Sequence, residues 1–382
     1  MRRIGTWILI IVLFLLTQNA QAGWTPAKRL TWTSGMSWDP AIAVDSSGHL
    51  HVVWADYPLE NSEIYYKKST DGGASWTSSK RFTWTSGDSQ APAIAVDPSD
   101  HLHVIWQDHT PGNYEIYYKK SVDGGATWTS NQRLTWISGV SAEPDVAVDS
   151  SGHLHIVWRD TTTGNGEIYY KQTTDGGVTW KATKRLTWTP GSSSYPAMAV
   201  DSSQHLHVVW HDNSPGNVEI YCVRSTNGGS GWSTSKRLTW TSGTSYVPRI
   251  AADSSGGVHL VWFDDDSGNY EVYYRRSPDG GATWLWNQRL SWNPGDSWDP
   301  AITVDSSDRL HVVWHDFTPG NDDIYYKKST NGGAAWTLNQ RLTWNSGASR
   351  VPVIAADPSG HLHLLWHDET PGNYEIFYKN GN

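Results

Sequence analysis

Short apolar runs separated by turn-forming residues recur along the chain, and the second copy shows the pattern clearly. Its first three runs cover 92–97, 101–106 and 115–121, and a fourth lies within 128–136. The segments between them, Pro-Ser-Asp, Thr-Pro-Gly-Asn and Asp-Gly-Gly, are strong turn formers. Four runs of this length joined by tight turns predict four short antiparallel strands.

The four-run unit repeats with a constant period. The segment Arg-Leu-Thr-Trp, with minor changes, recurs every 52 residues and begins at Arg29, Arg81, Arg133, Arg185, Arg237, Arg289 and Arg341. A period of about fifty residues with four strands is typical of a β-propeller blade, so seven units predict an all-β, seven-bladed propeller of four-stranded antiparallel blades. A solenoid is the alternative, but its ends would need polar caps of a kind that these termini do not resemble.

The two ends of the repeat region complement each other. The last repeat stops at 379–382 without a fourth strand, whereas the segment that begins at Gly23 resembles one. Trp24 precedes Arg29 by five residues, as Trp76 precedes Arg81. We therefore expect the N-terminal strand to complete the last blade and to remove its exposed edge.

Residues 1–22 follow a different pattern. Arg2 and Arg3 precede an apolar run over 8–16, and Ala20-Gln-Ala22 has the small-residue form of a cleavage site. This pattern predicts a signal peptide cleaved near Ala22 and Gly23, a secreted or periplasmic protein, and one propeller domain over 23–382. The run is short for a membrane span and no later stretch reaches 18 apolar residues, so we expect no membrane insertion.

Composition and charge restrict the fold class and the kinds of molecule that the protein is expected to bind. The chain has 25 Trp, 18 Tyr and 35 Gly but 5 Phe and one Cys, a balance that favours β-structure over packed helices. Its formal charge is −9, and loss of Arg2 and Arg3 leaves 27 basic against 38 acidic residues, or −11. This sign disfavours nucleic acid or an anionic membrane as the partner. Cys222 stands where other repeats have Tyr, which predicts a buried substitute and not a nucleophile.

The most specific local motif is Ser/Thr-x-Asp-x-Gly-x-x-Trp, in the turn between the third and fourth strands. Its side chain and glycines suit a tight hairpin, and the Trp would pack beneath it. The motif resembles the Asp-box, or bacterial neuraminidase repeat, of sialidases and other secreted propellers. The resemblance implies a structural role for the Asx residues, which are Asp71, Asp123, Asp175, Asn227, Asp279 and Asn331.

Most Trp and His residues have structural interpretations. Three Trp per repeat, including the one in Arg-Leu-Thr-Trp, account for 21 of 25, and we expect them to pack between blades. Paired histidines such as His49 and His51 share a strand face and allow a metal pair, but a hydrogen-bonded, half-buried histidine is favoured. Asp56 and its equivalents follow the second strand and are expected to support a turn, although a calcium site is an alternative. We expect no other cofactor and no metal site.

The sialidase resemblance would imply an Arg triad, a Tyr activated by Glu, and an acidic Asp. The family's Phe/Tyr-Arg-Ile-Pro signature is missing, and sialidase domains usually have six blades. Arg159, Arg249 and Arg350 break the repeat and are candidates to converge, but the sequence pairs no unique Tyr with a unique Glu. Catalytic residues are therefore unassigned, and a glycoside hydrolase is the second hypothesis.

Comparison of the repeats predicts which face binds a ligand. The loops between strands two and three, and those leading into the next blade, emerge together and vary towards aromatic and Arg residues, which suit interfaces and sugar rings. We therefore expect a binding module for carbohydrate or a cell-surface polymer, with a protein-binding scaffold as a further alternative. The candidate ligand residues are Trp38, Tyr57, Arg159, Tyr246, Phe263, Trp298, Phe317 and Arg350.

Overall fold

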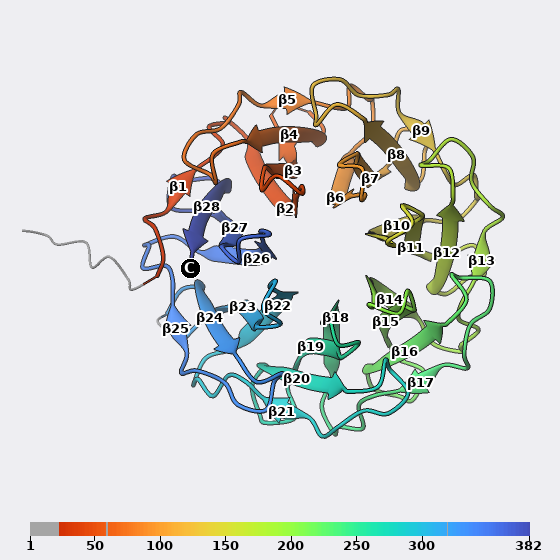
Figure 1. The fold of residues 1–382 in the computed structure, drawn as a ribbon, viewed down its shortest axis with the longest axis vertical. Helices are drawn as coiled ribbons and strands as arrows, with labels where there is room; N and C mark the ends of the chain where they lie inside the picture. The colour runs from red at the N-terminus through yellow and green to blue at the C-terminus, as the bar shows by residue number, and fades with distance from the viewer. Residues whose placement is uncertain (1–22, 59, 319) are drawn as a thin grey trace, which may run out of the picture.

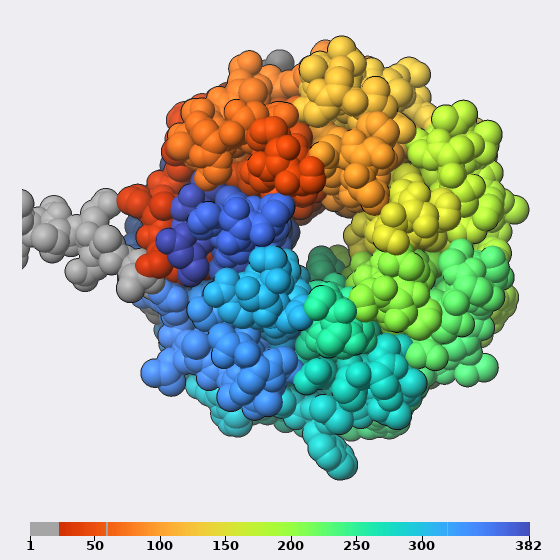
Figure 2. Space-filling view, in the orientation of Figure 1, coloured from red at the N-terminus to blue at the C-terminus, as the bar shows by residue number. Residues whose placement is uncertain are grey.

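Seven four-stranded antiparallel sheets are arranged in a ring in the computed structural model (Figure 1). The structure describes residues 23–58, 60–318 and 320–382, and within them the regular elements are all strands. The innermost strands surround a central opening, which Figure 2 shows in space-filling form. The predicted seven-bladed propeller is confirmed.

Each blade runs from an inner strand at the opening to a short outer strand at the periphery. The inner strands are β2 (Met36–Val44), β6 (Ser89–Val96), β10 (Ser141–Val148), β14 (Ser193–Val200), β18 (Ser245–Ala252), β22 (Ser297–Val304) and β26 (Ser349–Ala356). The second strands are β3 (Leu50–Tyr57), β7 (Leu102–Asp108), β11 (Leu154–Asp160), β15 (Leu206–Asp212), β19 (Val258–Asp264), β23 (Leu310–Asp316) and β27 (Leu362–Asp368). The third strands are β4 (Glu63–Ser69), β8 (Glu115–Ser121), β12 (Glu167–Thr173), β16 (Glu219–Ser225), β20 (Glu271–Ser277), β24 (Asp323–Ser329) and β28 (Glu375–Gly381). The outer strands are β5 (Lys80–Arg81), β9 (Gln132–Arg133), β13 (Lys184–Arg185), β17 (Lys236–Arg237), β21 (Gln288–Arg289), β25 (Gln340–Arg341) and β1 (Lys28–Arg29).

The N-terminal strand closes the ring. Strand β1 is the outer strand of the sheet formed by β26, β27 and β28, with Lys28 opposite Tyr378. Trp24 forms an isolated bridge to Gly381, and its ring meets Tyr326 edge-on at 5.3 Å. Trp24 thus has the same type of contact as the Asp-box Trp128, which packs on Tyr66 at 5.2 Å. The predicted closure is confirmed.

The core lies between blades, because both faces of each sheet are covered by neighbours. One cluster joins Ile64 and Tyr66 of the first blade to Val104 and Trp106 of the second. The second-strand tryptophans are almost fully buried in every blade, as the sequence predicts. Cys222 is also buried and belongs to such a cluster, and burial raises the pKa of its thiol to about 12, so the interpretation as a packing residue is confirmed.

The Asp-box turns have the predicted hairpin form. Asp71 accepts hydrogen bonds from the backbone N–H of Ser75 and the hydroxyl of Ser69, both at 2.8 Å. Hydrogen bonds from Ser75, first from its hydroxyl and then from its backbone, lower the pKa of Asp71 to about 2. The turn is therefore held by local bonds, and its Trp76 packs edge-on against Tyr378 of the neighbouring blade at 5.2 Å.

The second histidine of each His-Leu-His pair belongs to a buried network. His51 lies 2.9 Å from the hydroxyl of Tyr66 and 3.2 Å from a carboxylate oxygen of Asp45. Burial lowers the pKa of His51 to about 4, which favours the neutral ring. His49, which is partly exposed, also contacts Asp45, at 2.8 Å. The histidines are hydrogen-bonded as expected, but the second one is fully buried rather than half-buried.

The fourth strand lies within the predicted run over 128–136, at Gln132–Arg133, but the expectation for the tryptophan that follows it is wrong. Beyond the strand, Thr135 uses its side-chain oxygen to accept from the backbone of Ile116. The tryptophans of the Arg-Leu-Thr-Trp segments follow this short strand and are 56–71% exposed, so they do not pack between blades. We call them the rim tryptophans: Trp32, Trp84, Trp136, Trp188, Trp240, Trp292 and Trp344.

The described segments contain no helix long and apolar enough to cross a bilayer. The expected signal peptide over 1–22 lies outside the described residues.

Candidate functional site

Two sets of loops meet on one face of the ring, which we call the variable face. They are the loops between the second and third strands and the connections from each outer strand to the next blade. His109 in one donates its backbone N–H to Asp88 in the other at 2.8 Å, and Glu369 bonds Ala348 in the same way at 2.9 Å. The loops that the sequence predicts to emerge together are therefore in direct contact.

An aromatic row crosses this face over the fourth, fifth and sixth blades. Tyr195 stacks on His211 at 5.3 Å, and His211 meets Tyr246 edge-on at 5.3 Å. The row continues through Phe263, 5.7 Å from Tyr246, to Tyr270, which lies 5.4 Å from Phe263. From Tyr270 the row continues to Trp298, with ring centroids 6.3 Å apart. It ends at His315, whose ring centroid is 5.5 Å from that of Trp298. Three candidate residues, Tyr246, Phe263 and Trp298, are thereby brought into one chain of ring contacts, in which Tyr195 is exposed, Tyr246 and Trp298 are partly exposed and Phe263 is buried.

Two further candidates form a separate pair in the first blade. Trp38 stacks on Tyr57 with ring centroids 6.2 Å apart and planes 21° from parallel. Both side chains are partly exposed, and the Tyr57 hydroxyl donates to the carbonyl oxygen of Glu60. The pair is a second aromatic platform on the variable face.

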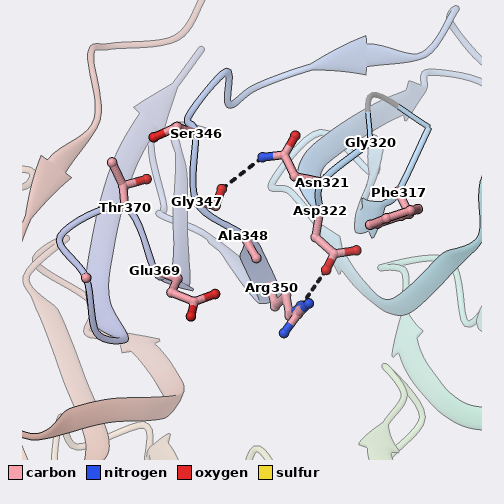
Figure 3. A pocket seen from close by; sticks show the side chains of 11 residues that line it. Phe317, Gly320, Asn321, Asp322, Ser346, Gly347, Ala348, Arg350, Glu369 and Thr370 are labelled. Carbon is pink, nitrogen blue, oxygen red and sulfur yellow. Dashed lines mark hydrogen bonds and ion pairs between the residues drawn. The ribbon is translucent and has the colours of Figure 1, made fainter.

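A pocket of about 430 Å³ lies between the sixth and seventh blades and includes the candidates Phe317 and Arg350 (Figure 3). Phe317 is 46% exposed at one side of it. The guanidinium group of Arg350 donates to Asp322 at 2.5 Å and to the hydroxyl of Tyr374 at 2.8 Å. Asn321 closes the back of the pocket by donating to the carbonyl oxygen of Gly347 at 2.9 Å. The pocket thus offers one aromatic wall, one oriented cation and the carboxylate of Glu369.

Asp322 is a pocket residue that the sequence analysis missed. Its side chain is 1% exposed, and its second carboxylate oxygen has no hydrogen-bond partner among the described residues. Other repeats have Ser, Tyr, Gly or Val at this position, so a comparison of the residue before the conserved Glu would have singled it out.

The inner strands carry a bulge just where they enter the variable face. Ladder pairing shifts between Trp38 and Ala41 in β2 and at the same place in the other inner strands. The bulged residue has positive φ in every blade, which is uncommon for residues other than glycine. These residues are Asp39, Ala91, Glu143, Tyr195, Val247, Asp299 and Val351, and four of them are acidic or phenolic.

Asp39 and Asp299 of this set interact electrostatically with each other and with Arg249. Desolvation by burial and the charge of Asp299 raise the pKa of Asp39 to about 6, opposed by Arg249. Desolvation by burial also raises the pKa of Asp299, and the charge of Arg249 opposes this shift. Asp39, Arg249 and Asp299 belong to the inner strands of the first, fifth and sixth blades, so charges from three blades influence one another. We call Asp39, Glu143, Tyr195, Arg249 and Asp299 the channel cluster.

Glu143 contacts Tyr195 through the backbone amide and not through the phenol, so the expectation that no unique Glu activates a unique Tyr stays a prediction. Glu143 accepts from the backbone N–H of Tyr195 at 2.7 Å and from Arg159 at 3.0 Å. Burial and the Glu143 charge raise the pKa of the Tyr195 phenol. This contact could not be predicted from the sequence, because the two residues lie in neighbouring repeats. Both occupy bulge positions, where the alternation of side chains along a strand does not show which way a residue faces.

The three irregular arginines have separate partners. Arg159 binds Glu143, Arg350 binds Asp322, and Arg249 donates to the carbonyl oxygen of Pro248. They come from the third, seventh and fifth blades and do not converge on one described partner.

The acidic residues after the second strand are engaged with protein donors. Asp108 accepts from Ser89 at 2.8 Å and from the backbone of Thr110 at 2.9 Å, as expected for a residue that supports the turn. In the part of the chain that the structure describes, no group of three or more His, Cys, Asp or Glu side chains is arranged to hold a metal ion.

Comparison of the sequence with models of known protein families identifies the repeat family. A BNR repeat-like domain model matches residues 9–260. The chain belongs to this family. No curated protein matches the chain in sequence.

Solved structures share the fold at low identity. A polysaccharide lyase described as an ulvan lyase is 10% identical, with a TM-score of 0.65 over 90% of this chain and 94% of that one. A Hadza microbial sialidase is 14% identical, with a TM-score of 0.55 over 89% and 74% of the two chains. An α-L-arabinofuranosidase from Fusarium graminearum is 13% identical, with a TM-score of 0.54 over 90% and 92%. This BNR-repeat chain is thus a sialidase-like propeller in architecture.

Proposed function

We propose that this protein binds carbohydrate on the variable face, along the aromatic row that leads to the channel cluster. The observation that carries the proposal is the continuous row from Tyr195 to Trp298 across three blades. Aromatic rings combine a large apolar face with little conformational freedom, which suits stacking on sugar rings. Similar folds whose names indicate polysaccharide lyase, sialidase and arabinofuranosidase support a carbohydrate ligand.

The row would hold the sugar chain, and the neighbouring polar groups would orient it. Arg350 in the pocket between the sixth and seventh blades is fixed by Asp322 and Tyr374, so little side-chain entropy would be lost when it meets a ligand. We expect no metal ion or other cofactor to be needed for this binding. The N-terminal pattern favours export, so the ligand would be an extracellular glycan or a cell-surface polymer.

The test is a glycan array followed by titration of the best ligand. Replacing Trp298 and Tyr246 by Ala should weaken binding by about 1–3 kcal/mol, the range known for aromatic stacking on nucleobases. Trp286→Ala is the matched control, because Trp286 is 91% exposed in the turn that precedes β21, outside the row. Equal affinity of the double variant and the parent protein would contradict binding at the row.

A second candidate function is cleavage of the bound glycan at the channel cluster. The specific observation is that burial raises the pKa of both Asp39 and Asp299, since glycosidases use a pair of carboxyl groups of which one, the acid, has a raised pKa. We expect no release of sialic acid from an aryl sialoside, since the Arg-Ile-Pro signature is missing. Sustained turnover of any glycan that disappears in Asp39→Asn would instead assign the protein to the hydrolases or lyases.

A further inference from the structure

The rim tryptophans are large aromatic side chains that are exposed and the same in all seven repeats. Two residues after each Asp-box Trp, a peripheral position varies freely: Ser78, Ser130, Ala182, Thr234, Trp286 and Leu338. The rim tryptophans are also mostly exposed, so burial of their rings in the core does not explain their presence. Exposed Trp side chains are enriched at sites of recognition, so this regular set is a candidate interaction surface.

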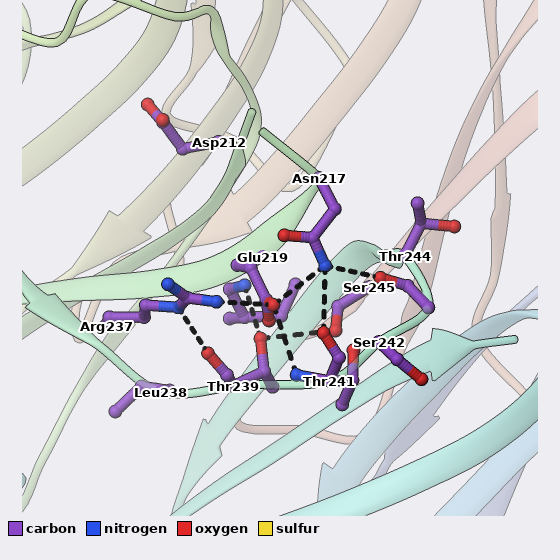
Figure 4. Close-up of polar contacts among 12 residues, drawn as sticks. Asp212, Asn217, Glu219, Arg237, Leu238, Thr239, Thr241, Ser242, Thr244 and Ser245 are labelled. Atoms are coloured by element: carbon purple, nitrogen blue, oxygen red, sulfur yellow. Dashed lines mark hydrogen bonds and ion pairs between the residues drawn. The ribbon is translucent and has the colours of Figure 1, made fainter. Parts of the chain in front are cut away.

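Each rim tryptophan is held in a rigid connection. In the fourth blade, Glu219 accepts from Arg237 at 2.6 Å, from the backbone of Thr241 at 3.1 Å and from Asn217 at 3.0 Å (Figure 4). Trp240 lies between Thr239 and Thr241, and the Arg237 guanidinium carbon is 5.6 Å from its ring centroid.

The same cation–π contact recurs in all seven blades at 4.4–5.7 Å. An indole fixed in this way would lose little entropy on binding a ligand.

A groove lies beside the rim tryptophan at a blade junction. Between the second and third blades it has a volume of about 290 Å³, and its lining includes Trp136, Asp160, Tyr169, Lys171 and Thr183. This is at the small end of ligand pockets and suits one ring of a longer chain. Trp136 comes from the connection between β9 and β10, whereas Tyr169 and Lys171 belong to β12, so the groove exists only where two blades meet.

The groove contains one cation, and the equivalent lysines of other blades are largely buried beneath the rim, with Lys119 8% and Lys379 7% exposed. Lys171 donates to the carbonyl oxygen of Leu134 at 2.9 Å, and the equivalent cation makes the same contact in five other blades. No carboxylate in the described chain lies within 4.0 Å of these lysines, whereas the nearby Arg is neutralised by its Glu or Asp. Burial lowers the pKa of Lys119 and Lys379 only to about 8, so both are mainly protonated at pH 7. The fourth blade differs, because Val223 replaces the cation.

We propose that the rim tryptophans and the cations beneath them form a ring of repeated binding sites for an acidic polysaccharide. The aromatic ring would stack on a sugar, and the unpaired cation would meet its carboxylate or sulfate group. A cation with no carboxylate within 4.0 Å recurs in six of the seven blades of this negatively charged protein, and this arrangement favours an anionic partner. Repeated sites on one rigid ring would bind a repetitive polymer with avidity. This surface is separate from the aromatic row and does not depend on the function proposed for that row.

Affinity electrophoresis of the intact protein tests this. Native gels would contain polygalacturonate, dextran sulfate or neutral dextran. We expect retardation by the acidic polymers and none by dextran. Replacing Trp84, Trp136 and Trp292 by Ala should weaken retardation at least about tenfold, because three sites are lost from a multivalent ring. Replacing the cations of the same grooves, Lys119, Lys171 and Lys327, by Gln should weaken it for the acidic polymers as well.

Control variants distinguish binding at the rim from a loss of folding and from binding at the aromatic row. The melting temperature of the triple Trp variant should match that of the parent, since exposed side chains contribute little to stability. Trp286→Ala should bind as the parent does, and so should the Trp298→Ala, Tyr246→Ala variant, which tests the aromatic row instead. The proposal is overturned by equal retardation of the triple Trp variant, by no retardation on either acidic polymer, or by equal retardation on neutral dextran.

Discussion

Gly73 of the first blade packs directly against the phenol of Tyr378 in the last blade. A Cβ at Gly73 would lie 2.1 Å from the Tyr378 hydroxyl oxygen, and φ at this glycine is +87°. The same relationship joins Gly125 to Tyr66 and Gly177 to Tyr118. The second glycine of the Asp-box is therefore required by the neighbouring blade as well as by its own turn.

Replacing Gly73 by Ala should lower the free energy of unfolding by about 1–3 kcal/mol, because the added methyl group overpacks the junction and the backbone is left-handed. Gly72→Ala is the control. Gly72 also has positive φ, at +66°, but nothing lies within 4 Å of its Cβ position. Denaturant titration should show the larger loss for Gly73→Ala, and equal losses would refute the proposed contact with Tyr378.

Deleting 23–32 should lower the melting temperature sharply or cause aggregation. The deletion removes β1, leaves the edge of β28 unpaired, and exposes the Tyr326 surface that Trp24 covers. Calorimetry and light scattering of a protein that begins at Gly23 provide the reference. If the shortened protein melts like this reference, the N-terminal strand does not hold the ring closed.

Cys222→Tyr should stabilise the fourth blade by about 1 kcal/mol. In other blades a Tyr hydroxyl bonds the buried His, as Tyr274 bonds His259 at 2.7 Å, whereas Cys222 offers His207 no such partner. Gly281 lies opposite this position, and a Cβ at Gly281 would be 3.0 Å from His207 Nδ1, whereas the equivalent glycines of other blades face a phenol. Thermal unfolding with Cys222→Ala as the smaller-side-chain control tests this, and a lower melting temperature for the Tyr variant would show that the junction has repacked around the thiol.

Asp39→Asn should stabilise the protein at pH 7 to 8 but not at pH 4. Desolvation in the opening and the charge of Asp299 raise the pKa of Asp39 from 3.8 to about 6. The folded state therefore binds this proton more tightly than the unfolded state does, so ionisation of Asp39 costs stability as pH rises from about 4 to about 6. The penalty persists above pH 6 in the parent and is absent in the Asn variant. Denaturant titrations across pH 4–8 should show two curves that separate over this interval, and parallel curves would contradict the shift.

The sequence by itself determined the number of blades, their order and their closure. The 52-residue period, the turn residues and the match of Trp24 to Trp76 are local or periodic features, and they survive folding because every blade repeats the same hydrogen-bonded turns. Burial of the second-strand Trp54 and of Cys222 also follows from strand position alone.

For residues beyond the ends of the strands and at the bulges, only the tertiary structure decided what each side chain faces. Trp32 and Trp54 are both aromatic residues at the ends of apolar runs, yet the first is exposed because the outer strand already ends at Arg29, and the second lies between blades. Asp39 and Asp299 are 260 positions apart in the chain, yet each lies at the bulge of an inner strand of the closed ring, and the charge of Asp299 raises the pKa of Asp39. The sequence period specifies the fold of each blade. Which residues of different repeats come together depends on the radius of the closed ring and on the bulge that shifts the pairing of each inner strand.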